Sequence, residues 1–151
     1  MGKLKNIGSI AFVALLMMVF VVMPFSIAII NDFLASDTLK EIKSAGLPEN
    51  TKLLSEYAVA GKVSGNGNGM QYFGAVLIKS DLDVSKIQEY YEKSDCEISV
   101  QVKAQESDKI TVLNSEHYFD GVDGQSFENC YIVYGYGSGG NSILDLDLRG
   151  H

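Results

Sequence analysis

One apolar run dominates the first 30 residues of the sequence. Residues 7–30 contain no charged side chain, and 20 of their 24 positions are apolar. A helix of 24 residues is about 36 Å long, and the hydrocarbon core of a bilayer is about 30 Å thick. The pattern therefore predicts a transmembrane helix over 7–30. We expect Pro24 to kink or weaken this helix near its outer end, where Ser26, water or a neighbouring helix can satisfy the freed carbonyl.

A cleaved secretory signal is the alternative interpretation of this run. Such signals carry an apolar region of about 7–15 residues, followed by a small-x-small cleavage site. The run is longer than that, and residues 29–33 contain no such site. Only residues 33–36, Phe-Leu-Ala-Ser, resemble one weakly. The length therefore favours an uncleaved anchor.

The charges beside the run predict its orientation. Lys3 and Lys5 precede it, whereas residues 31–39 contain no Lys or Arg. Cationic flanks stay on the cytoplasmic side, and a long acidic domain is translocated regardless of its charge. We therefore expect residues 1–6 to form a cytoplasmic tail. The chain would then be a single-pass protein of the cell membrane, with its carboxy-terminal part outside.

The pattern after the run predicts a connector over residues 31–46. This segment contains a short amphipathic stretch over 36–43, which Gly46 and Pro48 end. The extracytoplasmic domain is therefore expected to occupy residues 47–151.

The first half of that domain predicts a hairpin and a helix. Residues 57–63 and 70–79 are strand-like, and the segment 64–69 between them has the Gly, Asn and Ser content of a turn. Asp83 is placed to cap a helix of about three turns, with Leu82 and Ile87 as its hydrophobic staple. The inward stripe of this helix is expected to be Val84, Ile87 and Tyr91.

The second half predicts four more strands. Residues 96–105 alternate between apolar and polar side chains, which is typical of a half-buried strand, and we expect residues 110–113 to be its partner. Residues 127–136 and 144–148 are also strand-like. The order β-β-α-β-β-β-β predicts an α+β domain, in which one main helix packs on a mainly antiparallel sheet.

Charge narrows the range of functions. The chain has 12 Lys+Arg and 19 Asp+Glu, which gives a net charge of −7. Residues 31–151 alone carry −9, and Lys3 and Lys5 add +2. An acidic domain lacks the positive field that drives binding to phosphates, so a nucleic-acid partner is disfavoured. The composition also excludes collagen, coiled-coil arrays and long disordered tails.

The sequence assembles no catalytic set. Its two histidines are His117 and the terminal His151, which is too few for a convincing His-based nucleophile or zinc site. Asp120, Asp123 and Glu128 do not have the spacing of a calcium loop. We therefore expect no catalytic residue, metal or cofactor. A pair of carboxylates that meet only in the fold remains an open alternative.

Two features suggest a recognition surface. Backbone amides in the run Gly-Asn-Gly-Asn-Gly over 65–69 can hydrogen-bond a polar ligand, although a hairpin turn is the structural alternative. Tyrosines near glycines at 134 and 136 offer apolar rings with polar tips, although strand packing also explains them. The candidate ligand-binding residues are Asn66, Asn68, Tyr72, Tyr134 and Tyr136.

The two cysteines, Cys96 and Cys130, leave two interpretations open. An even count in an exported domain permits a disulfide, and two separate buried thiols are the alternative. A bond would close a loop of 33 intervening residues. It would stabilise the fold by roughly 3–4 kcal/mol in the chain-entropy model.

Several segments of residues 47–151 together resemble a known group of proteins. They are Leu47-Pro48, Gly61-Lys62, the run Gly-Asn-Gly-Asn-Gly-Met-Gln-Tyr-Phe-Gly over 65–74, Ser80-Asp81-Leu82, Tyr90-Tyr91, and Asp-Leu-Arg-Gly-His over 147–151. The chain resembles small, uncharacterised, single-pass membrane-anchored proteins of Firmicutes. The resemblance implies a Gram-positive cell envelope. It supplies no known activity and no functional residue.

The sequence favours a membrane-anchored binding or protein-interaction module over a catalyst. Its expected partners are the lipid bilayer, through residues 7–30, and an envelope protein or a small polar ligand. Two alternatives remain: a cell-envelope hydrolase that uses clustered carboxylates, and a small accessory subunit whose membrane helix contacts a larger complex.

Overall fold

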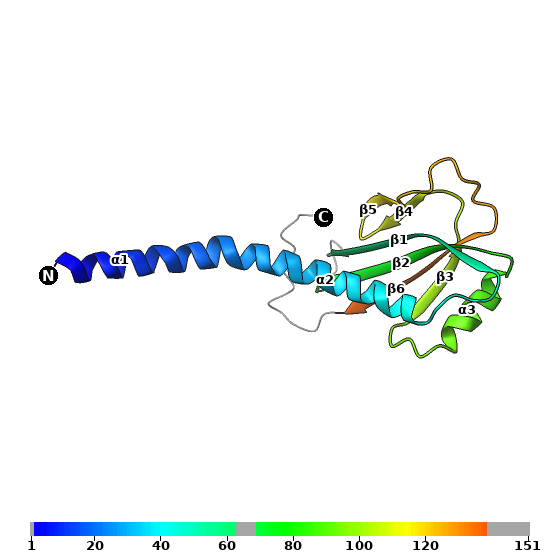
Figure 1. The fold of residues 1–151 in the computed structure, drawn as a ribbon, viewed down its shortest axis with the longest axis horizontal. Helices are drawn as coiled ribbons and strands as arrows, with labels where there is room; N and C mark the ends of the chain where they lie inside the picture. The colour runs from blue at the N-terminus through cyan, green and yellow to red at the C-terminus, as the bar shows by residue number, and fades with distance from the viewer. Residues whose placement is uncertain (1, 63–68, 139–151) are drawn as a thin grey trace.

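A long helix leads directly into a folded domain (Figure 1). The structure, a computed structural model, describes residues 2–62 and 69–138. The helix is continuous through α1 (Gly2–Met17), a π-helical turn (Met18–Val22) and α2 (Met23–Ser44). The remaining elements are β1 (Thr51–Gly61), β2 (Gln71–Ser80), α3 (Val84–Glu92), β3 (Val100–Ala104), β4 (Lys109–Val112), β5 (Ser115–Tyr118) and β6 (Cys130–Ser138).

The strands form two antiparallel sheets. The larger has the order β1-β2-β6-β3, and the smaller consists of β4 and β5. The chain is therefore an α+β protein with an antiparallel sheet, as predicted. The predicted hairpin is also confirmed, because β1 pairs with β2 from Thr51 opposite Ser80 to Gly61 opposite Gln71. Within its turn, residues 63–68 lie outside the described residues.

The larger sheet lies between two layers. Because side chains alternate along a strand, β2 directs Val76 and Ile78 towards the helices, and Phe73 and Leu77 towards the β4–β5 hairpin. Ile42 of α2 and the α3 residues Ile87 and Tyr91 complete the helical side of the core. On the other side, the core is completed by Val112, Leu113, Phe119 and Val122.

The structure confirms the predicted N-terminal cap of α3 and the α3 side chains that were predicted to face the core. The Asp83 carboxylate accepts a hydrogen bond from the Lys86 backbone N–H at 3.0 Å, and this bond is the main reason why the pKa of Asp83 is lowered. Ile87 and Tyr91 are buried. The side chain of Gln88 bonds both Val100 O and Val102 N, so α3 also covers part of the open edge of β3.

Tyrosines join α3 to the end of α2. The Tyr90 hydroxyl donates to Ala45 O at 2.8 Å, and the Tyr91 hydroxyl donates to Gly46 O at 3.1 Å. Burial raises the pKa of Tyr91 to about 12, so its hydroxyl keeps its proton at physiological pH.

The strand pairing of the second half differs from the prediction. Residues 96–105 contain only the strand β3, which pairs with β6 and not with residues 110–113. Residues 110–112 belong to β4, whose partner is β5, a strand that was not predicted. The predicted strand over 127–136 corresponds to β6, which begins three residues later. The predicted strand over 144–148 lies outside the described residues.

Residues 31–46 do not form a separate connector. Residues 31–44 belong to α2, whose buried positions Ile27, Asn31, Ala35, Thr38 and Ile42 follow one helical face. This face packs on the sheet at two glycines: a Cβ on Gly74 would lie 2.6 Å from Leu39 N, and one on Gly137 would lie 2.5 Å from Thr38 Oγ1. The outer half of α2 therefore belongs to the folded domain.

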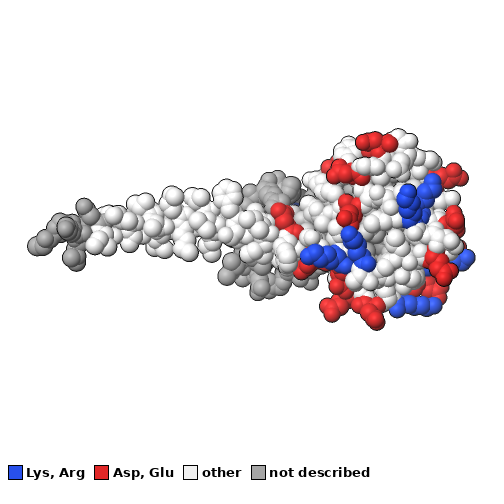
Figure 2. Space-filling view, viewed as in Figure 1, with Lys and Arg blue, Asp and Glu red and all other residues white. Residues whose placement is uncertain are grey.

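The apolar part of the helix is long enough to cross a bilayer. Within the described residues, one helix, Ile7–Ser44, has the length and hydropathy of a membrane span. Its first buried residue after position 7 is Ile27. The stretch 7–26 measures about 30 Å as a helix, which matches the hydrocarbon core of a bilayer. In Figure 2 the described part of the rod shows no charged surface on the visible side until it nears the domain.

Pro24 is accommodated without a break in this helix. The π-helical turn Met18–Val22 lies directly before it, and Met23 N–H bonds Met18 O across that turn. The Ser26 hydroxyl donates to Val22 O at 2.9 Å. Proline lacks an N–H for the carbonyl four residues earlier, which is that of Phe20, so Ser26 satisfies a different carbonyl from the one expected.

We predict that Tyr72→Phe destabilises the contact between α2 and the sheet. The Tyr72 hydroxyl donates to Asn31 Oδ1 at 3.1 Å, and both side chains are buried. Loss of the donor should lower the free energy of unfolding by about 1–3 kcal/mol, because a buried acceptor loses its partner. Denaturant unfolding in detergent micelles measures this. Asn31→Leu combined with Tyr72→Phe should recover much of the loss, and a single variant as stable as wild type would contradict the prediction.

Candidate functional site

A groove lined by both aromatic and charged side chains lies between the two sheets. It encloses about 220 Å³ on the side of the larger sheet that faces the β4–β5 hairpin. Strands β2, β3, β4 and β6 contribute to it, so residues distant in the sequence meet there. The residues that line it are Phe73, Lys103, Gln105, Lys109, Ile110, Thr111, Ile132, Tyr134 and Tyr136.

Three aromatic rings form one wall of the groove. The ring centroid of Phe73 lies 5.1 Å from that of Tyr136 and 5.8 Å from that of Tyr134, and the two tyrosine rings are 6.3 Å apart in an edge-to-face arrangement. Phe73 and Tyr134 are buried, whereas Tyr136 is 44% exposed. Tyr136 is therefore the ring that a ligand can reach. Within the described residues that follow α2, only Leu47 and Tyr118 are comparably exposed large hydrophobic residues.

Hydrogen bonds fix the surroundings of these rings. The Tyr134 hydroxyl donates to Gln101 Oε1 at 2.7 Å, which holds the ring against β3. The Gln105 amide donates to Ser107 O at 2.9 Å and to Lys109 O at 2.7 Å, which fixes the turn between β3 and β4. The groove is thus lined by side chains whose positions are set before any ligand arrives.

Two lysines supply positive charge to the groove. Lys103 places its ammonium 5.4 Å from the centroid of the Tyr134 ring, which is a cation–π contact. Lys109 forms an ion pair with Glu116, and this hydrogen bond is the main reason why the pKa of Lys109 is raised. Burial raises the pKa of Tyr136 more than the nearby Lys103 lowers it, so its hydroxyl is neutral at physiological pH.

The structure separates the predicted site residues. Tyr134 and Tyr136 both line the groove. Tyr72 points to the opposite face of the sheet, where it is buried against α2. Asn66 and Asn68 lie outside the described residues. Sequence reasoning missed Phe73, Lys103 and Lys109, because these residues reach the groove only through the pairing of β2 and β3 with β6 and through the placement of β4.

A second groove contains carboxylates. It encloses about 210 Å³ beside α2, and its lining includes Asp37, Glu41 and Glu97 together with Tyr72 and Gly137. Glu41 Oε1 accepts a hydrogen bond from the Glu97 backbone N–H at 2.9 Å, so one carboxylate also ties the loop before β3 to α2. The fold therefore brings three acidic side chains to the lining of one groove.

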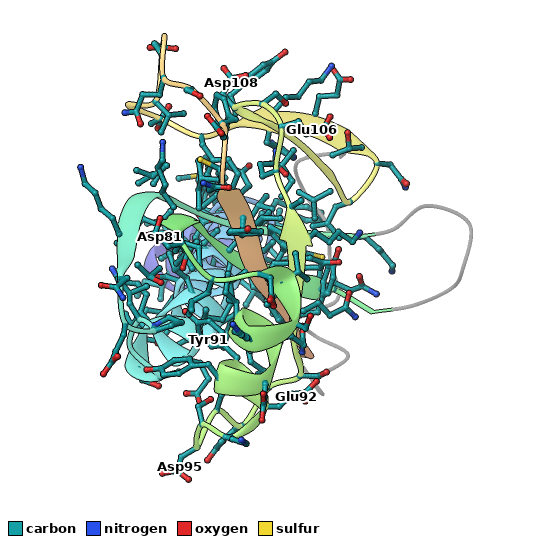
Figure 3. All side chains as sticks on the ribbon, turned by 90° about the vertical axis from the view of Figure 1, so that its right-hand side faces the viewer. Asp81, Tyr91, Glu92, Asp95, Glu106 and Asp108 are labelled. Atoms are coloured by element: carbon teal, nitrogen blue, oxygen red, sulfur yellow. The ribbon has the colours of Figure 1, made fainter. Side chains whose placement is uncertain are left out.

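Another cavity, of about 390 Å³, lies at the end of α2 furthest from the amino terminus. Its Tyr90 hydroxyl already bonds Ala45 O, and Lys93 already pairs with Glu89. Around the same end of the domain, Figure 3 shows that the labelled acidic side chains point outward and do not converge. Among the described residues, no group of three or more His, Cys, Asp or Glu side chains is placed to hold a metal ion.

The two cysteines are free thiols in the structure. Cys130 packs with the core on the hairpin side of the sheet, and Cys96 packs with the core on the helical side. A disulfide between them does not form because the sheet separates the two side chains. Burial raises the pKa of both thiols, which makes them poor nucleophiles at neutral pH.

His117 has a structural role in joining the two sheets. Its Nδ1 lies 2.6 Å from the Tyr57 hydroxyl, and the centroids of the two rings are 5.0 Å apart. The contact links β5 to the edge strand β1. Nearby, the Ser55 hydroxyl donates to Asp120 O at 2.9 Å, which fastens the loop that follows β5.

Comparison with known proteins identifies no relative. No family model matches the chain, and neither a curated protein nor a solved structure matches it. The fold therefore defines the chain only as an α+β domain joined to an apolar helix that is long enough to cross a membrane.

Proposed function

We propose that the chain is a single-pass membrane protein whose domain lies outside the membrane and binds a ligand in the groove between its two sheets. The observation that carries this proposal is the groove itself. It combines an accessible aromatic ring with fixed polar neighbours, and this combination is typical of small-molecule sites. The resemblance to membrane-anchored proteins of Firmicutes supports a Gram-positive envelope as its setting.

Because the helix runs without interruption from its apolar part into the folded domain, we expect it to hold the groove at a fixed height above the membrane. Ile27 is the first buried residue of the helix after position 7, and the backbone of Leu39 lies against Gly74, the neighbour of Phe73. Twelve residues of helix separate Ile27 from Leu39, which corresponds to about 18 Å. A domain held in this way would present its groove close to the bilayer surface, without a flexible stalk.

The proposal is tested by a fragment screen on the full chain in lipid nanodiscs. The probes are small water-soluble aromatic acids, amides and amines, and the readout is the NMR shift of labelled tyrosine rings. We expect saturable binding that shifts the Tyr136 ring. Tyr136→Ala should weaken that binding roughly tenfold, because the accessible ring is lost.

Tyr118→Ala is the matched control for this screen. Tyr118 is a 55%-exposed tyrosine on β5 that does not line the groove. Its replacement should leave fragment binding unchanged. If no probe binds saturably to wild type, or if both variants lose binding equally, the groove is not the binding site.

A cell-envelope hydrolase is the second candidate, and the acidic groove beside α2 favours it. Glycoside hydrolysis needs two carboxyl groups on either side of the scissile bond, and this groove contains three acids. The test is release of soluble sugar from isolated cell wall by the full chain. Activity that Glu97→Gln abolishes and Glu106→Gln retains would support the hydrolase. Equal release by all three proteins and the buffer blank would remove it.

A further inference from the structure

We propose that the groove between the sheets selects small organic anions that carry a flat apolar group. The inference rests on the proposed function, since it specifies the ligand of the same groove. The anionic group would bind at Lys103 and Lys109, and the flat group would pack on Tyr136.

The charge of the groove is opposite to that of the chain. The chain carries a net charge of −7, yet the described residues that line this groove include two lysines and no Asp or Glu. The two lysines come from β3 and β4, so the fold brings both charges to one place. Glu116 pairs with Lys109, so Lys103 supplies the positive charge of the groove that no acid among the described residues pairs. Acids further away than one Debye length, about 8–10 Å, are screened by salt.

Lys103 is the more available of the two cations. Lys109 is already paired with Glu116, whereas no carboxylate within the described part of the chain forms an ion pair with Lys103. Instead, the Lys103 ammonium rests over the Tyr134 ring. An incoming carboxylate can therefore bind Lys103 without first displacing an acidic side chain.

The aromatic wall by itself would equally suit a cationic ligand, because cations bind the faces of aromatic rings. Here the Lys103 ammonium already lies over one of the three rings. A second cation would be repelled by Lys103, whereas the charge of Lys109 is offset by Glu116. The placement of these two charges therefore favours an anion over a quaternary ammonium or another amine.

The size and the apolar lining limit the rest of the ligand. The groove encloses about 220 Å³, which is below the roughly 300–1,000 Å³ of sites for drug-sized ligands. Its apolar lining comes from Phe73, Ile110 and Ile132 as well as the two tyrosines. A single ring or a short branched chain with one acidic group fits this space, whereas a long polymer would occupy it only with one unit.

Phenylacetate and its neutral isostere phenylacetamide test the inference directly. Both are titrated into the full chain in nanodiscs, with the shifts of the labelled Tyr134 and Tyr136 rings as the readout (Tyr134 alone in Tyr136→Ala) and acetate as the probe without a ring. We expect phenylacetate to bind about fivefold more tightly than phenylacetamide, and acetate to bind more weakly than phenylacetate. Lys103→Gln should bring the affinities for the acid and the amide to within twofold of each other.

Lys52→Gln is the matched control, because Lys52 is an exposed lysine of β1 that does not line the groove. It should preserve the preference for the acid. Equal affinities for acid and amide in wild type, both lost in Tyr136→Ala, would overturn the anion inference while the binding groove stands. A preference that survives Lys103→Gln would also overturn it. If no probe binds, the proposed function fails together with the inference.

Discussion

Replacing Gly74 with valine should detach α2 from the sheet. Even a Cβ at this position would lie 2.6 Å from Leu39 N and 2.8 Å from Leu39 Cα, and helix backbone cannot move aside as a side chain can. Overpacking of this kind costs about 1–3 kcal/mol and occasionally more, and we expect at least about 3 kcal/mol here because the clash involves main-chain atoms. Chemical unfolding in micelles, followed by circular dichroism, measures the loss.

Gly61→Ala is a milder substitution with which the loss of stability in Gly74→Ala can be compared. An added Cβ at Gly61 would meet the Cδ1 atom of Leu113 at 2.9 Å, which is the far end of a flexible side chain. That substitution should cost clearly less than Gly74→Ala, because Leu113 can adjust. If both alanine variants unfold at the same denaturant concentration as wild type, α2 does not pack on the sheet as described.

Ile42→Ala should cause the other large loss of stability. Ile42 is fully buried between α2, α3 and the sheet. Truncation of a buried isoleucine to alanine costs about 2–5 kcal/mol, because apolar contacts are lost and a cavity remains. The measurement is again the unfolding midpoint of the folded domain in the full chain.

Ile29→Ala is the control on the same helix. Ile29 is 67% exposed in the apolar part of the helix, so its truncation should leave the unfolding of the domain nearly unchanged. If residues 31–46 were a connector outside the core, neither Ile42→Ala nor Ile29→Ala would change the unfolding midpoint of the domain. A large effect of Ile42→Ala alone identifies the outer half of α2 as part of the core.

Local signals in the sequence were sufficient for some elements. The uncharged run predicted the long helix, Asp83 predicted the start of α3, and the polar turn between two β-rich runs predicted the first hairpin. Each of these depends on residues that are close in the sequence. Such patterns specify an element without knowledge of its partners.

The continuation of α2 was harder to predict because its buried face contains polar residues. Positions 27, 31, 35, 38 and 42 have helical spacing, but two of them are Asn31 and Thr38. Asn31 is satisfied by Tyr72, and the Thr38 hydroxyl bonds Leu34 O on its own helix. The spacing was visible in the sequence, whereas the partner that makes Asn31 suitable for burial was not.

The β4–β5 hairpin was missed because its turn is unusual. The two residues between the strands, Leu113 and Asn114, have φ values of 51° and 63°. Two-residue turns of this kind normally contain Asn-Gly, since positive φ is unfavourable for leucine. Burial of the Leu113 side chain in the core beside Phe119 offsets that cost, and this packing is a long-range effect.

Only part of the candidate site followed from the sequence. Tyr134 and Tyr136 were predicted from their side-chain chemistry, and both line the groove. Tyr72 was grouped with them although its neighbour Phe73 is the residue that pairs with Tyr136 across β2 and β6. A shift of one residue reverses the face of a strand, so this choice required the register of the sheet.

The most direct test of the central claim is the labelling of single cysteines in intact cells with a membrane-impermeant maleimide. The two native thiols have raised pKa values, so wild type serves as the blank. We predict that Lys52→Cys is labelled in intact cells and that Asn6→Cys is labelled only after permeabilisation. Labelling of Asn6→Cys in intact cells, protection of Lys52→Cys until lysis, or a mature chain that lacks residue 6 would contradict an anchored domain outside the membrane.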